Sequence, residues 1–310
     1  MKKTIKIAFK KFWRGFDYKD CLFYLLLSKH YDVEVTDILT EDIDILFVSC
    51  YGNEIIDDYV GTIKTVEICF ENFYPNFNKF DYFIGTYNIN NERSLRLPIY
   101  WYHSFYNVYQ PYPFINEPNL TKDILQEKTN NIGMVISNSH RDGIEYLLKL
   151  MEKFDFKSGG NFHKNIEIGR EYSDKIELFK TCKFGIAFEN SIHDDYITEK
   201  IYDCYLANVI PIYFGAKNIN NDFNPESFIN VHNYKNTDDL IQHIDYLMNN
   251  EDAYMDMLNK KRKLKWVDYT SRCEEFLINI IENGQIYNHI FGAIGWYHLG
   301  NIYRKKNNLI

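Results

Sequence analysis

The sequence predicts an α/β fold of two doubly wound domains with a cleft between them. Short apolar runs alternate with helical patterns, which is typical of βαβ units that build a mostly parallel sheet. The alternation starts again after a segment rich in proline and aromatic residues. The 310 residues suffice for two domains of ordinary size, and the 45% hydrophobic content can fill a core in each.

The first series of elements opens with a strand and a helix, and three more apolar runs predict further strands. In chain order we expect a strand at Ile5–Phe9, a helix at Asp17–His30 and strands at Ile43–Val48, Val66–Phe70 and Tyr82–Gly85. The next segment, from Pro98 to Pro118, carries four prolines, so we interpret it as a loop or an interdomain crossing.

The second series alternates in the same way. Its first helix has apolar side chains on one face, which predicts the face that packs on the sheet: Ile144, Leu147, Leu148 and Met151. In chain order we expect a strand at Ile132–Ile136, a helix at Gly143–Phe154, a turn at Ser158-Gly159-Gly160, a helix at Asp174–Thr181, a strand at Phe184–Phe188, a helix at Tyr196–Asn208 and a strand at Val209–Phe214.

Composition and charge narrow the class of protein. A net charge of -8 argues against nucleic acid as a partner, because phosphate backbones are bound by clustered lysine and arginine. The 26 tyrosines and 23 phenylalanines suit a cleft that stacks on sugars. The cysteines are widely spaced, and the tightest apolar run, Leu22–Leu27, is too short to cross a bilayer. We therefore expect reduced cysteines and a cytoplasmic location.

The segment from Glu189 to Lys200 is where the sequence carries most chemistry. A buried strand ends there in a polar loop, and the loop opens a helix with Glu199 and Lys200 in its first turn. Ligands of open α/β sheets bind beyond the carboxyl ends of the strands, and helix N-termini there favour phosphate. The lysine adds a positive charge, and the carboxylate can accept hydrogen bonds from ribose hydroxyls. This loop therefore indicates a site for a nucleoside diphosphate.

The same segment reads E-N-S-x-H-x-D-Y-I-T-E-K and is followed by P-x-x-x-G at Pro211–Gly215. It resembles the α1,3/4-fucosyltransferases, the GT-B-fold enzymes of glycosyltransferase family 10. The resemblance covers roughly residues 5 to 280 and is strongest to bacterial members. It is also carried by Phe70-Glu71-Asn72, Pro75-Asn76-Phe77, Phe80-Asp81-Tyr82, Leu95-Arg96-Leu97-Pro98, Ser137-Asn138, Ser158-Gly159-Gly160, Asp222-Phe223-Asn224-Pro225 and Ser227–Val231.

The resemblance implies a GT-B fold and an inverting α1,3-fucosyltransferase. Such an enzyme would move L-fucose from GDP-β-L-fucose to a hydroxyl of an N-acetylglucosamine-containing glycan of the N-acetyllactosamine or Lewis type. Residues 1–127 would bind the acceptor and carry the base, 128–280 would bind GDP-fucose, and 281–310 would form a helical tail. The partners implied are GDP-fucose and an acceptor oligosaccharide or glycolipid.

Site residues follow from the same resemblance. Glu71, just after a predicted strand, matches the catalytic base that deprotonates the acceptor hydroxyl. Arg141, Tyr196 and Lys200 match contacts of the donor diphosphate. Glu199 matches a contact of the ribose or the sugar, and Asn190 matches another residue of the donor site. Ser158, Gly159 and Gly160 form a candidate donor loop.

The sequence departs from the family pattern next to the proposed base. Phe70 stands where the family commonly has glycine, and Asn72-Phe73-Tyr74-Pro75 changes the surface after it. The donor is therefore better defined than the acceptor. Two alternatives stay open: a GT-B transferase with another nucleotide sugar, and a glycan-binding scaffold without catalysis.

We expect no metal and no cofactor beyond the donor. Asp42-Ile43-Asp44 has the D-x-D form of a metal-binding transferase motif, but it precedes a predicted strand far from the donor segment, so we interpret it as a strand start. No His or Cys cluster has metal-ligand spacing. Arg141 and Lys200 would then stabilise the leaving diphosphate.

Two further segments concern partners. The basic run Lys260–Lys265 is expected to be a solvated helix face, with a peripheral contact at the inner face of an anionic membrane left open. Residues 293–303 have the W-x₂-L-G-x₂-Y spacing of the first helix of a tetratricopeptide repeat. A single such helix either packs on the enzyme or begins a repeat domain for self-association or a protein partner.

Overall fold

The computed structural model of the chain describes residues 2–52, 61–108, 119–265 and 267–287. Its contacts divide the chain into two compact units. The first comprises Met1–Cys69, Pro75–Ile84 and Glu274–Ile310, and the second comprises Phe70–Tyr74 and Gly85–Cys273. The domain boundaries expected from the sequence stay predictions, and the contacts group the chain differently, since the proposed base is counted with the second unit.

A parallel sheet forms the first unit, as its buried apolar runs predict. Its strands follow the order β2 (Asp32–Val35), β1 (Thr4–Lys10), β3 (Ile45–Ser49), β4 (Thr65–Cys69) and β5 (Tyr82–Gly85). The pairs β1–β2, β1–β3 and β3–β4 are parallel, so these strands end at one edge. All five residues of β3 and of β4 are buried.

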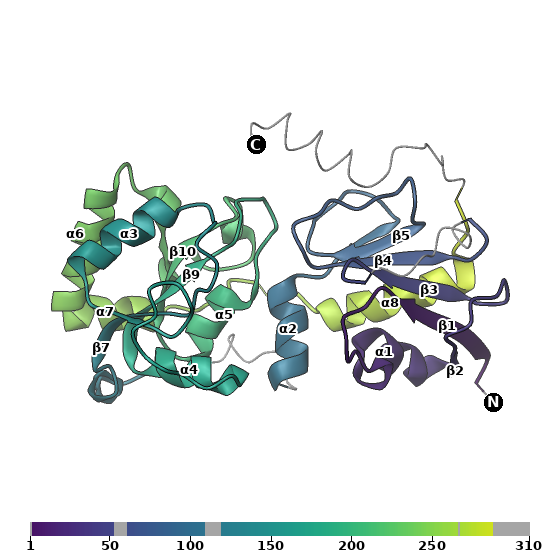
Figure 1. Cartoon of the computed structure of the whole chain (residues 1–310), viewed down its shortest axis with the longest axis horizontal. Coiled ribbons are helices and arrows are strands. Elements are labelled where there is room, and N and C mark those ends of the chain that lie inside the picture. Colours follow the sequence, from purple (N-terminus) through teal and green to yellow (C-terminus); the bar gives the residue numbers. More distant parts are fainter. Residues whose placement is uncertain (1, 53–60, 109–118, 266, 288–310) are drawn as a thin grey trace. The chain divides into compact units, whose positions relative to one another are not determined.

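Helices flank this first sheet (Figure 1). They are the short η1 (Tyr18–Asp20), α1 (Leu22–His30) and α8 (Tyr269–Asn283), of which the part from Glu274 belongs to this unit. Lys29 at the end of α1 pairs with Glu274 of α8 at 2.7 Å. Lys64, just before β4, donates to the carbonyl oxygen of Ile280 at 3.1 Å. These contacts fix α8 to a helix and to the start of a strand that lie more than two hundred residues earlier in the chain.

The second unit contains another parallel sheet with helices on both faces (Figure 1). Its strands follow the order β11 (Ile229–Asn230), β10 (Ile210–Phe214), β9 (Cys182–Phe188), β7 (Asn130–Met134) and β8 (Phe156–Ser158). One face packs in a common apolar core with α3 (Ile144–Lys153), α6 (Thr237–Asn249) and α7 (Glu251–Leu258).

The other face of this sheet is covered by α4 (Tyr172–Lys180) and α5 (Glu199–Leu206). Glycines let both helices approach closely. A Cβ on Gly133 of β7 would lie 2.9 Å from Phe179 of α4, and one on Gly185 of β9 would lie 2.6 Å from Cys204 of α5. The remaining elements are β6 (Ser94–Arg96), α2 (Ile99–Val108), η3 (Lys122–Gln126), η4 (Ile219–Asn221), η5 (Pro225–Ser227) and η6 (Val231–Asn233).

Three expectations from the sequence are wrong. The segment after Pro98 forms the helix α2 over Ile99–Val108 where a loop was expected, because proline is compatible with a helix start. On α3, Leu148 is 40% exposed and Leu150 takes the buried position. In the basic run after α7, Arg262 and Lys263 are buried, so the run is no solvated helix face.

The remaining expectations concern membrane-spanning helices, the cysteines, the Asp42-Ile43-Asp44 motif and the C-terminal tail. Among the described residues, no helix is both long and apolar enough to span a membrane. The six cysteines are free thiols, all buried except the half-buried Cys50. Asp42 and Asp44 precede β3, as expected, and both bond to Lys6 of the neighbouring β1. The repeat-like segment 293–303 lies outside the described residues.

Candidate active site

Loops at the carboxyl edge of the second sheet form the candidate site. They follow β7, β9 and β10, whose parallel pairing makes them end at the same edge. The loop after β9 leads directly into α5, which begins at Glu199 with Thr198 as its N-cap. Glu199 and Lys200 therefore lie in the first turn of α5, as predicted, whereas Tyr196 precedes the helix.

Glu189, the first residue after β9, organises this turn. Its carboxylate accepts hydrogen bonds from the backbone N–H and the hydroxyl of Thr198, at 2.8 and 2.7 Å. The Nζ atom of Lys200 donates to the same carboxylate at 3.1 Å and to the Thr198 hydroxyl at 2.8 Å. The side chain of Glu189 is fully buried, whereas that of Lys200 is 19% exposed. The Lys200 side chain is thus partly accessible, whereas the carboxylate that holds its ammonium group is not.

The charges of this pair depend on each other. Burial raises the pKa of Glu189, and Lys200 opposes that rise. For Lys200, burial lowers the pKa, but the carboxylates of Glu189 and Glu199 outweigh burial and raise it. Lys200 is therefore a firmly protonated cation.

Arg141 supplies a second cation from the loop after β7. Its guanidinium donates to the carbonyl oxygens of Asn138 and Phe188, both at 3.0 Å, which fixes its plane against the end of β9. Burial lowers its pKa, while Glu189 and Tyr196 act in the opposite direction. Arg141 bonds to Phe188 and Lys200 bonds to the next residue, Glu189, so both cations are held at the end of β9.

Glu199 belongs to a charged network under α5. Burial raises its pKa, but Lys200 and Lys175 outweigh burial and lower the pKa to about 2. Lys175 of α4 also pairs with the buried Asp203 of α5, which accepts a further hydrogen bond from Tyr172. The Glu199 carboxylate is therefore ionised, and it lies 3.8 Å from the Nζ atom of Lys200.

The other predicted donor residues differ in accessibility. Asn190 is exposed and Tyr196 is buried, both in the loop between β9 and α5. Ser158 ends β8, and its hydroxyl donates to the carbonyl oxygen of Phe162 at 2.7 Å, so this hydroxyl is used inside its own turn. A Cβ on Gly160 would lie 2.2 Å from the Ile136 backbone, which explains a glycine there.

The segment with Glu71 is tied to the same loop. Asn72, the next residue, donates to the Ser191 hydroxyl at 2.6 Å and accepts a hydrogen bond from Tyr87. Tyr74 stacks on Tyr87 with ring centroids 4.5 Å apart, and both rings meet the edge of His193. Contacts therefore bring the residue next to Glu71 against the residue next to Asn190.

Sequence reasoning missed two residues that hold the site together. Glu189 was recognised only as part of the motif, although its position between a buried strand and a helix start with a lysine could have suggested an internal partner. Asn72 likewise follows the proposed base, but its hydrogen bond to Ser191 joins segments 119 residues apart. In the part of the chain that the structure describes, no group of three or more His, Cys, Asp or Glu could hold a metal ion.

Comparison with known proteins places this site in a family. The family model for the glycosyltransferase family 10 (fucosyltransferase) C-terminal region matches residues 125–285. The model for the alpha-(1,3)-fucosyltransferase FucT N-terminal domain matches residues 7–103. The chain therefore belongs to glycosyltransferase family 10. The predicted family is confirmed.

Individual relatives agree with this family. The alpha-(1,3)-fucosyltransferase FucT of Helicobacter pylori is 31% identical over 284 residues, which cover 82% of this family 10 chain. The chain spans 59% of the length of that protein. The 4-galactosyl-N-acetylglucosaminide 3-alpha-L-fucosyltransferase 9 of Homo sapiens is 36% identical over 110 residues, or 32% of this chain and 31% of the human protein.

Solved structures confirm the predicted GT-B fold. A crystal structure of an alpha1,3-fucosyltransferase with GDP-fucose is 28% identical and has a TM-score of 0.74, covering 93% of both chains. The structure with GDP has a TM-score of 0.75 at the same identity and coverage.

Proposed function

We propose that this family 10 chain is an inverting α1,3-fucosyltransferase. It transfers L-fucose from GDP-β-L-fucose to a hydroxyl of an N-acetylglucosamine-containing glycan of the N-acetyllactosamine type. The solved relative with GDP-fucose supports this donor, and the names of the Helicobacter pylori and human relatives support the linkage. Cytoplasmic location and the acceptor partner are part of the same proposal.

In the proposed reaction the acceptor oxygen attacks the anomeric carbon of fucose from the face opposite the diphosphate. One carbon–oxygen bond forms while the bond to the β-phosphate oxygen breaks, so the β-linked donor gives an α-linked product. The Glu71 carboxylate takes the hydroxyl proton, and GDP leaves with the bonding electron pair. Cations beside the diphosphate stabilise the negative charge that develops on the leaving oxygen.

Arg141 and Lys200 are the proposed cations. Lys200 suits this role because its side chain is partly exposed while that of its counter-charge, Glu189, is fully buried. A phosphate would then meet the ammonium first and the helix N-terminus of α5 next to it. Tyr196 and Asn190 are proposed as further donor contacts, Gly159 and Gly160 as a loop beside the donor, and Glu199 as the acceptor of ribose or fucose hydroxyl hydrogens. We propose that no divalent metal is required.

The single observation that carries the proposal is the link between the two motif segments. The hydrogen bond from Asn72 to Ser191 joins the residue after the proposed base to the loop that holds the proposed cations. The same unit contains both segments, which supports a proposed base held in a defined position relative to the proposed cations, as a transfer reaction needs.

A donor screen tests this proposal. The chain is incubated with N-acetyllactosamine and, in turn, GDP-fucose, GDP-mannose and UDP-galactose, and nucleotide release is measured. We expect release only from GDP-fucose, together with a fucosylated product whose anomeric NMR coupling reports the α configuration. Release from another donor would favour a different GT-B transferase, and the absence of both GDP binding and release over a broad acceptor panel would favour a non-catalytic scaffold.

A further inference from the structure

Some loop residues adopt a backbone conformation that side chains disfavour. In the part of the chain that the structure describes, four residues other than glycine have a positive φ: Lys11 (64°), His163 (48°), Asp195 (66°) and Asn208 (51°). A Cβ atom makes this left-handed conformation unfavourable, and Asn, Asp and His tolerate it best. Such a residue persists only where its surroundings hold it. The contacts around each residue therefore show which loop is held.

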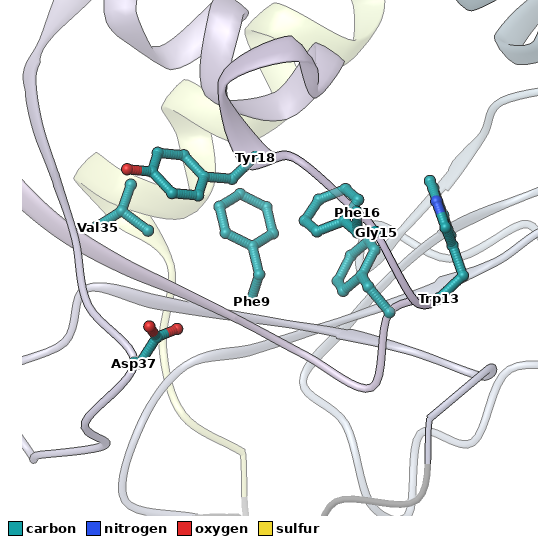
Figure 2. A pocket seen from close by; sticks show the side chains of 8 residues that line it. Phe9, Trp13, Gly15, Phe16, Tyr18, Val35 and Asp37 are labelled. Atoms are coloured by element: carbon teal, nitrogen blue, oxygen red, sulfur yellow. The ribbon is translucent and has the colours of Figure 1, made fainter.

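Lys11 illustrates how such a residue directs a loop. It follows β1, and its carbonyl oxygen accepts hydrogen bonds from the backbone N–H groups of Tyr51 and Gly52, at 3.1 and 2.7 Å. The chain on either side of it lines an aromatic pocket of about 220 Å³ in the first unit, where the rings of Phe9 and Phe16 lie 5.4 Å apart (Figure 2). The left-handed residue and its two hydrogen bonds thus set the path of the loop after the strand.

Asp195, in the loop between β9 and α5 of the second unit, is held by all of its polar groups. Its backbone N–H donates to the side-chain oxygen of Asn218 at 2.9 Å, and the Asn218 amide donates back to the Asp195 carboxylate at 2.9 Å. The other carboxylate oxygen accepts a hydrogen bond from the backbone N–H of Asn88 at 3.0 Å. The Asp195 carbonyl oxygen accepts one from the Thr86 hydroxyl at 2.7 Å. We call Asn218, Asn88 and Thr86 the Asp195 clamp.

The Asp195 clamp comes from two segments of the second unit. Asn218 lies in the loop after β10, whereas Thr86 and Asn88 follow β5. Tyr87, between the last two, donates a hydrogen bond to Asn72, the residue after the proposed base. The segment that holds Asp195 therefore also contacts the segment that carries the base.

The turn from 195 to 198 carries the chain into α5 and is held at both ends. At its start, the Asp195 carbonyl oxygen also accepts a hydrogen bond from the backbone N–H of Ile197 at 3.0 Å. At its end, Thr198 is bound through its N–H and its hydroxyl to the buried carboxylate of Glu189. Tyr196, between the two ends, is 3% exposed. The conformation of Asp195 therefore sets how the chain enters the first turn of α5.

We propose that Asp195 is a positioning residue for the donor: its clamped left-handed conformation holds the turn that presents Tyr196 and Lys200 to the diphosphate. The inference rests on the proposed function and adds a residue that acts through these two. Where the competent turn is only partly populated, the apparent affinity for GDP falls in proportion to the populated fraction. Saturating donor restores the competent turn. Loss of the clamp should therefore raise the KM for GDP-fucose and leave kcat unchanged.

Substitutions of Asp195 provide the test, by steady-state kinetics with N-acetyllactosamine and by calorimetric titration with GDP. Asp195→Ala keeps the Cβ atom and loses the carboxylate. We expect it to raise the KM for GDP-fucose and the Kd for GDP about tenfold, the size of the penalty for one such residue in the left-handed conformation. Asp195→Gly and Asp195→Asn tolerate that conformation, so both values should stay within about threefold of native.

Asn208→Ala is the matched control, because Asn208 is also left-handed but lies between α5 and β10, at the edge of the sheet opposite the candidate site. It should lower the melting temperature, as Asp195→Ala does, and leave the KM for GDP-fucose unchanged. A rise in that KM for both variants alike would reduce Asp195 to a structural role and overturn the inference. Were Asp195→Ala not to fold, Thr86→Val removes one bond of the clamp, and an unchanged KM in this variant would overturn the inference too.

GDP binding separates this inference from the proposed function. Turnover with equal GDP affinities in native protein and Asp195→Ala would overturn the inference and leave the proposed function standing. GDP affinities in the expected order without any transfer would support the role of Asp195 and contradict the proposed transfer. A native protein that binds no GDP would overturn both.

Discussion

Lys200 meets two demands that a surface lysine could not meet together. It is held in place by a buried carboxylate and the Thr198 hydroxyl, and its side chain still reaches solvent. A flexible exposed lysine would lose side-chain entropy when it bound a phosphate, whereas Lys200 is already ordered. Glu189 thus acts as a positioning residue for the proposed cation.

Substitution of Lys200 should separate stability from donor binding. Lys200→Met leaves Glu189 buried without its cation, so we expect a loss of about 3 kcal/mol in the free energy of unfolding. We also expect GDP affinity to fall by about ten- to a hundredfold, as for the loss of one charge-assisted hydrogen bond. Urea unfolding and calorimetric titration with GDP measure the two effects.

A second substitution distinguishes the effects. In Lys200→Met with Glu189→Gln, the buried charge is removed as well, so stability should return while GDP affinity stays low. Lys149→Met on the exposed side of α3 serves as the control and should change neither. Recovery of GDP affinity in the double variant would show that Lys200 acts only on folding.

The sequence identified several candidate site residues, but it did not show the contacts that their side chains make. The family resemblance pointed to Glu71 and Arg141, whereas the start of α5 pointed to Lys200 from the residues themselves. The sequence could not show that Ser158 uses its hydroxyl within its own turn, or that Asn72 reaches Ser191. Such pairs depend on side-chain directions in loops, for which neither the 3.6-residue nor the two-residue periodicity gives information.

Strand β4 carries a buried carboxylate at its centre. Glu67 is 5% exposed and accepts a hydrogen bond from the backbone N–H of Asn76 at 2.8 Å. Burial raises its pKa to about 7, despite the opposing hydrogen bond from Asn76. In an apolar strand between β3 and β5, the carboxyl group is more stable with its proton.

The buried carboxyl group of Glu67 predicts that the stability of the protein depends on pH. The folded pKa of Glu67, about 7, exceeds its ordinary value of 4.5, so its stabilising contribution is present below pH 4.5 and is lost as pH rises to about 7. We expect the native protein to lose about 3 kcal/mol relative to Glu67→Gln between pH 4.5 and pH 8. Urea unfolding at several pH values measures the difference, and parallel curves for the two proteins would contradict it.

Strand β6 is anchored in the second unit by a buried ion pair. The Arg96 guanidinium donates to both carboxylate oxygens of Asp222, at 2.9 and 2.7 Å, and the Tyr100 hydroxyl donates to the same carboxylate at 2.8 Å. These contacts join two motif segments that lie 126 residues apart.

Breaking this pair should be costly. Arg96→Leu leaves Asp222 buried without its cation, and we expect a loss of about 3–5 kcal/mol in the free energy of unfolding. Lys122→Met removes an exposed pair with Asp252 in the same unit and should have no measurable effect. Thermal unfolding of both variants measures this, and equal melting temperatures would contradict the role of the buried pair.

Most helices and strands were predicted because their apolar patterns are strong. The helix α2 was missed because proline and aromatic residues are typical of loops, yet its Tyr100, Trp101 and Tyr102 are buried. Short edge strands such as β2 and β11 carry few residues, so no periodicity identifies them.

At the scale of the whole molecule, two parallel α/β sheets were predictable from the repeated alternation along the chain. Which segments of the chain belong to which unit was not predictable. The C-terminal half of α8 belongs with the first unit through contacts such as Lys29 with Glu274, and residues 70–74 belong with the second. Both assignments depend on partners distant in sequence, which local patterns do not reveal.

The transfer rate of Glu71→Gln tests the central claim most directly. GDP binding and transfer from GDP-fucose to N-acetyllactosamine are measured for this variant and for the native protein. We expect GDP affinity within twofold of native and a transfer rate reduced by about 10²–10⁴-fold, since the neutral amide cannot take the proton. A variant that transfers fucose at the native rate would contradict the account.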